Sequence, residues 1–477
     1  MTRTYGRVIF LLFLYFLLSF GYIFSRGFYS SIGSLIILIS IILTVLKILK
    51  PDFFYPGTRP AKLGGSVRGW DFKIKKKLLI SVFSVSLFLN ISLTALLYGG
   101  LYQYFKPAVL MSNILLKIML VLSLALLFNL EKKYLRPVLK LLFIIWLVLH
   151  LLMIVSSPRP LIDVFDYLKQ GALAFWQGKN PYSISYQKMY LDVMPNYYSY
   201  FPFMIFYTLP FVLIFNDPRF SFVFSQITIF YFLAYKFSWK DKCFGQLFSV
   251  LIALLILFHP LSLYMTEQSY TEPLVFLEIL LLYYFLTKKN KFSAFVYGIS
   301  LATKQYLFFL APFLYKNKLF KKKHFFYAFL VFFLLISPFF LASPKDFVYD
   351  TILLQNIFPP RYEGLTFFSS LFRLFKLRYP FVIALTIWLG FGIFLIRRNA
   401  KQQTNFILEY ALFLLVFFYF NKWAFLNYYY LISNLYLLSI FITVHQTLLS
   451  PPRCEGHHTP PSPRLRRACP RCEVGVK

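Results

Sequence analysis

Two aspartates one helical turn apart, Asp163 and Asp166, are the strongest candidates for chemistry in this sequence. They follow directly after a long apolar run, and the chain contains only 17 Asp and Glu among its 477 residues. A carboxylate at a membrane surface can act as a general base for a hydroxyl group, and a pair of carboxylates can help to hold a divalent metal such as Mg or Mn. The spacing D-x-x-D by itself also fits a solvated loop, so both interpretations stay open at this point.

The residues around this pair predict a short helix followed by a turn. Asp163 and Asp166 begin the helix, Gly178 can end it, and Asn180-Pro181 turns the chain back. A third aspartate, Asp192, lies later in the same loop. The sequence therefore predicts an ordered loop with several carboxylates between about residues 158 and 200.

Two further titratable residues, Lys304 and His259, lie inside apolar segments of the sequence. Lys304 lies inside an apolar segment, and an intramembrane lysine predicts a function unless its amine reaches the membrane surface. No acid lies near it in sequence, and Glu278 on another predicted helix is the one protein partner that we consider. An anionic ligand such as a lipid phosphate would fit this cation. His259, which precedes Pro260, is predicted to be an interior histidine with its hydrogen bonds satisfied.

The elements that must position these residues are membrane helices. The chain is 59% hydrophobic, 22% aromatic and only 14% charged, which excludes an ordinary soluble protein. Its net charge of +33 comes from basic residues at the ends of apolar runs, so it indicates topology and lipid contact, and we expect no nucleic-acid partner. We predict an all-α polytopic membrane protein of about twelve transmembrane helices. These helices are expected to begin near residues 8, 30, 78, 108, 141, 218, 246, 273, 324, 380, 405 and 427.

Basic loops set the predicted orientation, with both termini in the cytoplasm and the loop of residues 158–200 outside. Two segments need special treatment. Residues 201–215 must enter the membrane without crossing it if Lys236 is to stay inside. Residues 292–315 have lysine clusters at both ends, which predicts a re-entrant pair of half-helices with Lys304 and Gln305 near the tip. One ordinary crossing is the alternative for this second segment.

Five short motifs follow one another along the chain. They are Asp163 with the later G-K-N-P-Y at 178–182 and Y-F-P at 200–202, H-P…Y-M-T-E-Q-S-Y-T-E at 259–272, A-T-K-Q-Y at 302–306, Q-N-I-F-P-P-R at 355–361, and N-K-W-A-F-L-N-Y-Y-Y at 421–430. Together they resemble the motifs of a known family, the GT-C fold glycosyltransferases that use polyprenyl-phosphate sugars, and in particular their bacterial mannosyltransferase-like branch. The resemblance covers about residues 158–438 and departs from many members in having four helices before Asp163.

The resemblance implies an inverting transfer of a hexose such as mannose from a polyprenyl-phosphate donor to a lipid, glycan or protein acceptor at the outer face of the plasma membrane. Asp163 would be the general base, and Asp166 its partner or a metal ligand. The donor phosphate would be bound by Lys304, Gln305, Arg361 and Lys422. A second polar site for the acceptor would comprise Glu267, Glu272, Asn427 and Tyr428. For Lys422, and for Glu267 and Glu272, an ordinary surface position is the alternative.

The chain divides by composition into three parts. Residues 1–140 form an N-terminal four-helix membrane segment, residues 141–449 the glycosyltransferase-like membrane core, and residues 450–477 a basic Cys/His/Pro tail. The tail contains Cys469-x-x-Cys472, so a zinc knuckle is conceivable, but no apolar core accompanies it and we predict disorder. A transporter or lipid flippase is the competing function, since such proteins also need intramembrane charge and broken helices. We find no repeat between the two halves that would favour it.

Overall fold

The computed structural model describes residues 2–49, 65–128, 132–186, 197–239, 242–378, 380–398 and 405–449. Over these residues the regular secondary structure is helical, apart from one isolated β bridge between Phe28 and Gly364. The predicted all-α class is confirmed. The tail of residues 450–477, with the zinc-knuckle alternative, and Asp192 lie outside the described residues.

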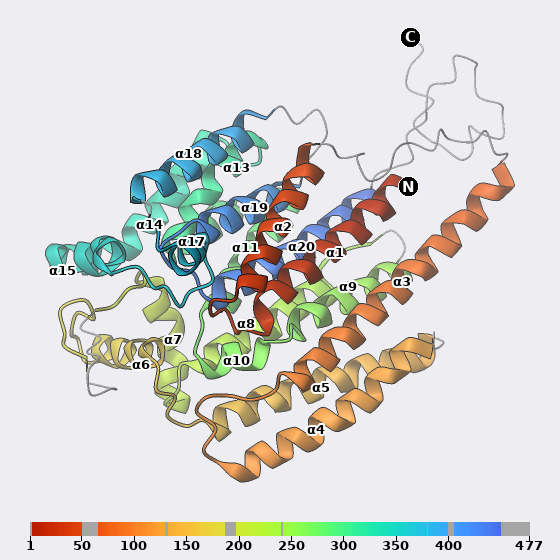
Figure 1. The fold of residues 1–477 in the computed structure, drawn as a ribbon, viewed down its shortest axis with the longest axis horizontal. Coiled ribbons are helices and arrows are strands. Elements are labelled where there is room, and N and C mark those ends of the chain that lie inside the picture. The colour runs from red at the N-terminus through yellow and green to blue at the C-terminus, as the bar shows by residue number, and fades with distance from the viewer. Residues whose placement is uncertain are drawn as a thin grey trace.

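Long helices from the N-terminal part run side by side along the molecule (Figure 1). They are apolar for most of their length, so each can satisfy its backbone internally and present side chains to lipid or to its neighbours. α1 packs along the last helix, α20, which joins the first and last parts of the chain. These helices are α1 (Thr2–Ile23), α2 (Ser31–Leu49), α3 (Gly65–Leu96), α4 (Lys106–Leu124), α5 (Lys132–Ser156) and α20 (Leu426–Leu449).

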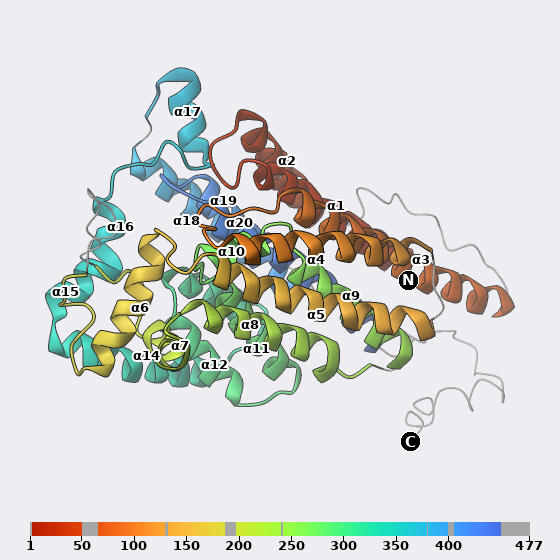
Figure 2. The ribbon, with the colours of Figure 1, turned by 90° about the horizontal axis from the view of Figure 1, so that it is seen from below.

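Short helices gather at one end of this bundle, on the left in Figure 2, away from the N-terminus. Breaks in hydrophobicity and prolines keep them short, as at Pro202 before α7 and Pro344 at the start of α15. This end of the molecule includes α6, whose first turn holds Asp163 and Asp166. The short helices are α6 (Asp163–Trp176), α7 (Phe203–Phe215), α15 (Pro344–Val348), α16 (Leu354–Ile357) and α17 (Phe367–Phe375).

The remaining helices complete the bundle, and a helix lies at each of the twelve predicted apolar runs. Six of the described helices, α1 to α5 and α14, are long and apolar enough to cross a membrane by length and composition. Multi-pass membrane character is therefore supported, and the full set of twelve crossings stays a prediction. The helices are α8 (Arg219–Tyr231), α9 (Lys242–Leu257), α10 (Ser262–Glu267), α11 (Glu272–Thr287), α12 (Phe292–Leu301), α13 (Ala311–Lys316), α14 (Lys322–Ala342), α18 (Phe381–Arg397) and α19 (Phe406–Tyr419).

The helical segment that carries Lys304 is broken, as the sequence predicts. α12 ends at Leu301, Lys304 has an extended backbone with φ −143° and ψ 143°, and a 3-10 turn over Gln305–Leu310 leads into α13. The carbonyl freed at Ala302 accepts a hydrogen bond of 2.9 Å from the Phe203 N–H at the start of α7. The break is thus stabilised by the neighbouring segment, as irregular backbone inside an apolar bundle requires.

The chain after the break returns to the end of the bundle from which it came. Lys316, at the end of α13, forms an ion pair of 2.9 Å with Glu409 near the start of α19, and it donates to the Leu395 carbonyl near the end of α18. Asn405, before α19, bonds to Ser439 in the second half of α20. α12 itself begins directly after α11 ends and packs against it. Both ends of the segment therefore lie away from the short helices α6, α7, α15, α16 and α17.

Candidate active site

Asp163 lies at the first position of α6, as predicted. The residue before it, Ile162, is extended, and the Asp163 Oδ1 accepts the Val164 N–H at 2.8 Å. Its Oδ2 accepts the hydroxyl of Tyr197 at 3.3 Å. Burial raises the pKa of Asp163, while the Val164 N–H and the nearby guanidinium of Arg361 lower it. A carboxylate in such surroundings takes up a proton more readily than one in water, which suits a general base.

Asp166 lies one turn further along α6 and is the second carboxylate of the pair. Burial raises the pKa of Asp166 to about 7, and the like charge of Asp163 adds to this effect. Its Oδ2 is buried and accepts no hydrogen bond from the part of the chain that the structure describes. The predicted helix after Asp163 is confirmed to Trp176, and Gly178 adopts a left-handed φ of 74° just beyond it.

Arg361 is the predicted cation that lies nearest to Asp163. Its guanidinium lies over the rings of Trp423 and Phe425, with distances of 5.5 and 5.6 Å from Cζ to the ring centroids. The Arg361 N–H donates to the Lys422 carbonyl at 3.3 Å, which joins the motif before α17 to the motif before α20. Two motifs about sixty residues apart are thus brought to the start of α6.

Lys304 pairs with an acid of the chain, but this acid is Glu272 and not Glu278, the protein partner considered from the sequence. Its Nζ lies 2.6 Å from Glu272 Oε1 at the first position of α11. The Asn427 amide donates to the same oxygen at 2.9 Å, and the other carboxylate oxygen, Oε2, is buried without a partner among the described residues. The ammonium also lies over the rings of Tyr200, Tyr306 and Tyr428, at 4.9 to 5.9 Å.

Glu278, the partner that the sequence suggested for Lys304, binds elsewhere. Its Oε1 accepts the hydroxyl of Thr303 at 2.6 Å, one residue before the lysine. α11 carries both glutamates, at its first and seventh positions. The lysine side chain reaches the first turn of α11, where Glu272 lies. Sequence distance could not decide between the two acids, because the choice depends on where α12 breaks.

The carboxylate pair and the lysine pair are neighbours in space. Tyr270, in the loop before α11, lies within electrostatic reach of both Asp163 and Glu272. The ring of Tyr167, on α6, lies 5.5 Å from that of Tyr200, which in turn covers Lys304. Residues from α6, α11, the break after α12 and the start of α20 therefore form one polar cluster, surrounded by tyrosines.

Two predicted site residues, Gln305 and Lys422, hold loops together. Gln305 donates from Nε2 to the carbonyls of Ser199 at 3.0 Å and Thr351 at 2.8 Å. Lys422 donates to the Phe358 carbonyl at 2.6 Å. Both residues stay close to the cluster, but these bonds give them a structural role at its edge.

Glu267 lies apart from the cluster and anchors the loop between α3 and α4. Its two carboxylate oxygens accept the N–H groups of Leu101 and Tyr102 at 2.9 and 2.8 Å. A Cβ at Gly100 would lie 2.0 Å from Glu267 Oε1, so only glycine allows this approach. The structure therefore assigns Glu267 to attaching the N-terminal helices to α10.

His259 is an interior histidine, as predicted. It is fully buried, and its Nε2 is hydrogen-bonded to the hydroxyl of Tyr22 at 2.7 Å and to Ser433 at 3.2 Å. The ring stacks on that of Tyr22. This network links α1 to α20.

A buried ion pair at the start of α8 was not predicted from the sequence. The guanidinium of Arg219 is fully buried and binds both oxygens of Asp217, with Nη2 2.5 Å from Oδ2. It also donates to Ser157 Oγ at 2.9 Å and to the Ile154 carbonyl, at the end of α5. The sequence N-D-P-R at 216–219 could have indicated this ion pair, because acids are rare in this chain and Asp217 lies two residues from an arginine.

Replacing Asp217 by alanine should lower the free energy of unfolding by about 3–5 kcal/mol, because it leaves a buried guanidinium unpaired. Thermal unfolding of the purified protein in detergent measures this effect. The exposed Asp346, changed to alanine in the same way, is the control and should cost less than about 1 kcal/mol. Equal unfolding temperatures for the two variants would contradict the buried-pair assignment.

Asp163 and Asp166 are not part of a larger metal-ligating cluster in the described part of the chain. Within the described ranges, no group of three or more His, Cys, Asp or Glu side chains comes together. The oxygens of Asp163 already accept the Val164 N–H and the Tyr197 hydroxyl, and the nearby charge is that of Arg361. These residues do not fit a resident divalent metal, and we derive no step through one.

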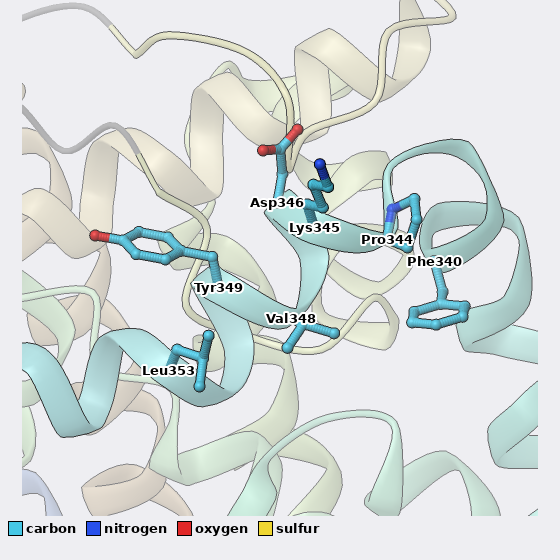
Figure 3. A pocket seen from close by; sticks show the side chains of 7 residues that line it. All are labelled: Phe340, Pro344, Lys345, Asp346, Val348, Tyr349 and Leu353. Atoms are coloured by element: carbon cyan, nitrogen blue, oxygen red, sulfur yellow. The ribbon is translucent and has the colours of Figure 1, made fainter.

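A surface hollow lies near the short outer helices and shares no residue with the polar cluster (Figure 3). It is open and mostly apolar, so it offers no group for the chemistry discussed here. The side chains that line it belong to the end of α14, to α15 and to the turn that follows: Phe340, Pro344, Lys345, Asp346, Val348, Tyr349 and Leu353.

Comparisons with protein-family models, with curated proteins and with solved structures find no significant match to this chain.

Proposed function

We propose that this chain is an integral membrane glycosyltransferase of the GT-C type. It transfers a hexose, for example mannose, from a polyprenyl-phosphate donor to an acceptor hydroxyl at the outer face of the plasma membrane. The observation that carries the proposal is the convergence of five motifs, spread over about 270 residues, at one end of the helical bundle. Asp163, Arg361, Glu272, Lys304 and Asn427 lie there in one cluster.

Asp163 is the general base of the proposed reaction. It removes the proton from the acceptor hydroxyl as the oxygen attacks the anomeric carbon of the sugar. The bond from that carbon to the lipid phosphate breaks, and the phosphate leaves with the electron pair, so the configuration at the carbon inverts. Asp166 lies one turn away and supports Asp163 electrostatically. The two carboxylates repel each other when both are charged, so each one raises the free energy of ionising the other.

Arg361 is the cation best placed to balance the charge that develops on the leaving phosphate. Its side chain is exposed, and the ion pairs of the described residues do not include it. A guanidinium matches phosphate oxygens with two parallel hydrogen bonds. The charge of Lys304 is already balanced by Glu272, so we place Lys304 in the wall of the site, where it positions Glu272, Asn427 and the tyrosines.

The proposed topology has twelve crossings, cytoplasmic termini and a re-entrant segment over residues 292–315. The positive ends of this segment support it, because basic residues favour the cytoplasm. The contacts of Lys316 with the last turn of α18 and the first turn of α19 support the re-entrant segment independently. α7 is the second non-crossing segment, since the Asp217–Arg219 turn after it contacts the end of α5 near the outer loop.

Cysteines introduced directly after Lys289 and directly after Lys318, in a protein without its native cysteines, should both resist an impermeant thiol reagent applied to intact cells. Both positions are cytoplasmic in the proposed topology. A cysteine in place of the exposed Ser183, in the outer loop, is the positive control and should be labelled. Labelling at just one of the two lysine positions would show an ordinary crossing.

The donor and acceptor can be identified with membranes that contain the protein. They would be incubated with polyprenyl-phosphate sugars carrying radiolabelled hexoses, and the labelled products would be extracted and separated. We expect one donor to yield a labelled acceptor that is missing from membranes with the Asp163→Asn variant. Equal labelling with both proteins for every donor would contradict the proposed function.

A further inference from the structure

The segment that joins α16 to α18 carries positive charge at the end of the bundle where the charge rule predicts little. Between residues 358 and 378 there are four basic residues and one acid, Glu363. Outer segments of membrane proteins usually carry few lysines and arginines. The preference of basic residues for the cytoplasmic side therefore does not explain the excess of positive charge in this segment.

Three of these cations form a compact surface with aromatic rings, which we call the α17 shelf: Arg373, Lys376, Arg378, Tyr362 and Phe372. The rings of Tyr362 and Phe372 stack with centroids 3.7 Å apart. Arg378 lies over both rings, and Lys376 lies over Phe372 at 5.6 Å. The Arg373 Nε donates to the Tyr362 carbonyl at 2.9 Å, which leaves its other N–H groups available.

The shelf is firmly attached to the rest of the molecule. Thr366 caps α17 by accepting the Ser369 N–H at 3.0 Å, and Ser370 bonds to Ser34 at the start of α2 at 2.6 Å. Arg373 also lies over the ring of Tyr29, in the turn between α1 and α2. The cations are therefore held in place by rigid elements. Figure 2 shows α17 beside α2, at the end of the molecule that carries the short helices.

Exposed apolar side chains flank the three cations. Leu374, Phe375 and Leu377 are 59%, 63% and 57% exposed, and Phe381 begins α18 directly beyond. All three cations are exposed as well, and no carboxylate in the described part of the chain forms an ion pair with them. Basic residues alternating with exposed leucine and phenylalanine are typical of segments that lie at a membrane interface.

We propose that the α17 shelf binds the phosphate of an anionic lipid headgroup in the outer leaflet. The guanidinium groups of Arg373 and Arg378 donate hydrogen bonds to the phosphate oxygens, and the exposed apolar residues contact the acyl chains. A soluble anion would gain nothing from Leu374, Phe375 and Leu377, so their exposure favours a lipid. The binding does not depend on the transfer reaction.

Lipid binding to the protein purified in neutral detergent tests the proposal. Phosphatidylglycerol and phosphatidylcholine with identical acyl chains would be titrated, and bound lipid counted by native mass spectrometry. Each basic residue near an anionic headgroup strengthens binding about fivefold. The triple variant Arg373→Gln, Lys376→Gln, Arg378→Gln should therefore bind phosphatidylglycerol about a hundredfold more weakly, with phosphatidylcholine unaffected.

A matched control removes the same charge at the opposite end of the bundle: Lys318→Gln, Lys322→Gln, Lys323→Gln. These lysines are also exposed, and the control should keep the tightest phosphatidylglycerol site. Equal losses in the two triple variants would show that binding reports only net charge and would overturn the proposal. The variant Arg373→Lys, Arg378→Lys keeps both positive charges. It should therefore bind phosphatidylglycerol much more tightly than the triple glutamine variant of the shelf does.

Two further comparisons locate the ligand. Glycerol phosphate, the soluble headgroup, should bind at least a hundredfold more weakly than the lipid. Equal affinity would indicate a site for free phosphate and overturn the lipid assignment. Asp163→Asn should leave lipid binding unchanged, whether or not the chain transfers sugar. Loss of lipid binding in that variant would place the lipid in the candidate active site instead.

Discussion

Replacing Asp163 by asparagine should reduce sugar transfer by about a hundredfold to ten-thousandfold, the usual contribution of a general base. Asparagine keeps the shape of the side chain and can still accept the Val164 N–H, so α6 should form normally. Burial raises the pKa of Asp163, which means that the ionised form is penalised in the folded protein. Removing the charge should therefore leave the unfolding temperature equal or slightly higher. Initial rates with a saturating labelled donor measure the effect.

Two other aspartates give this experiment its controls. Asp166→Asn should reduce transfer less than Asp163→Asn does, because Asp166 supports the pair from the next turn. Asp346→Asn, on exposed α15, should change neither rate nor stability. If Asp163→Asn keeps near wild-type turnover and Asp166→Asn is inactive, Asp166 is the general base and Asp163 the supporting carboxylate. If both variants stay active, neither aspartate is the general base and the proposed reaction is wrong.

Replacing either Lys304 or Glu272 by glutamine should lower the free energy of unfolding by about 3–5 kcal/mol, because each change leaves a buried charge without its partner. The double variant should recover most of this loss, since two neutral amides can bond to each other. Thermal unfolding of the four proteins forms a double-mutant cycle. Additive losses would show that the two residues do not interact in the folded protein.

Transfer activity in the same variants separates a role in the site from a purely structural one. The double variant at Lys304 and Glu272 should be stable but nearly inactive, because Asn427 and Tyr428 lose the charges that position them. The matched control is the pair of Lys316 and Glu409, at the other end of the bundle. Its double glutamine variant should recover both stability and activity. Full activity in both double variants would remove Lys304 from the site.

Local patterns in the sequence predicted the elements well. The apolar runs located the helices, and the placing of Asp163 and Gly178 predicted the start and the end of α6. Lysines at both ends of residues 292–315 predicted the break at Lys304, which the extended backbone there confirms. These features depend on residues close together in the chain, where hydropathy, charge and turn chemistry act directly.

Contacts between residues far apart in the chain could not be predicted from the sequence. Glu272 and Lys304 are 32 residues apart, and Glu278 was the nearer acid, so only the position of the break selects the partner. The tyrosines that cover Lys304 could not be chosen among 36 in the chain. The family resemblance of the 259–272 motif placed Glu267 in the site, while α10 in fact directs its side chain toward the loop after α3.

The most direct test of the central claim uses purified protein in detergent, where no membrane separates two compartments. Labelled polyprenyl-phosphate hexose is mixed with a detergent extract of envelope acceptors, and the products are separated after the reaction. A glycosyltransferase should move the label into a new covalent product with wild-type protein and not with Asp163→Asn. If the label stays on the donor in detergent, while the same protein in vesicles moves that donor across the bilayer, the chain is a lipid transporter and the proposed function is wrong.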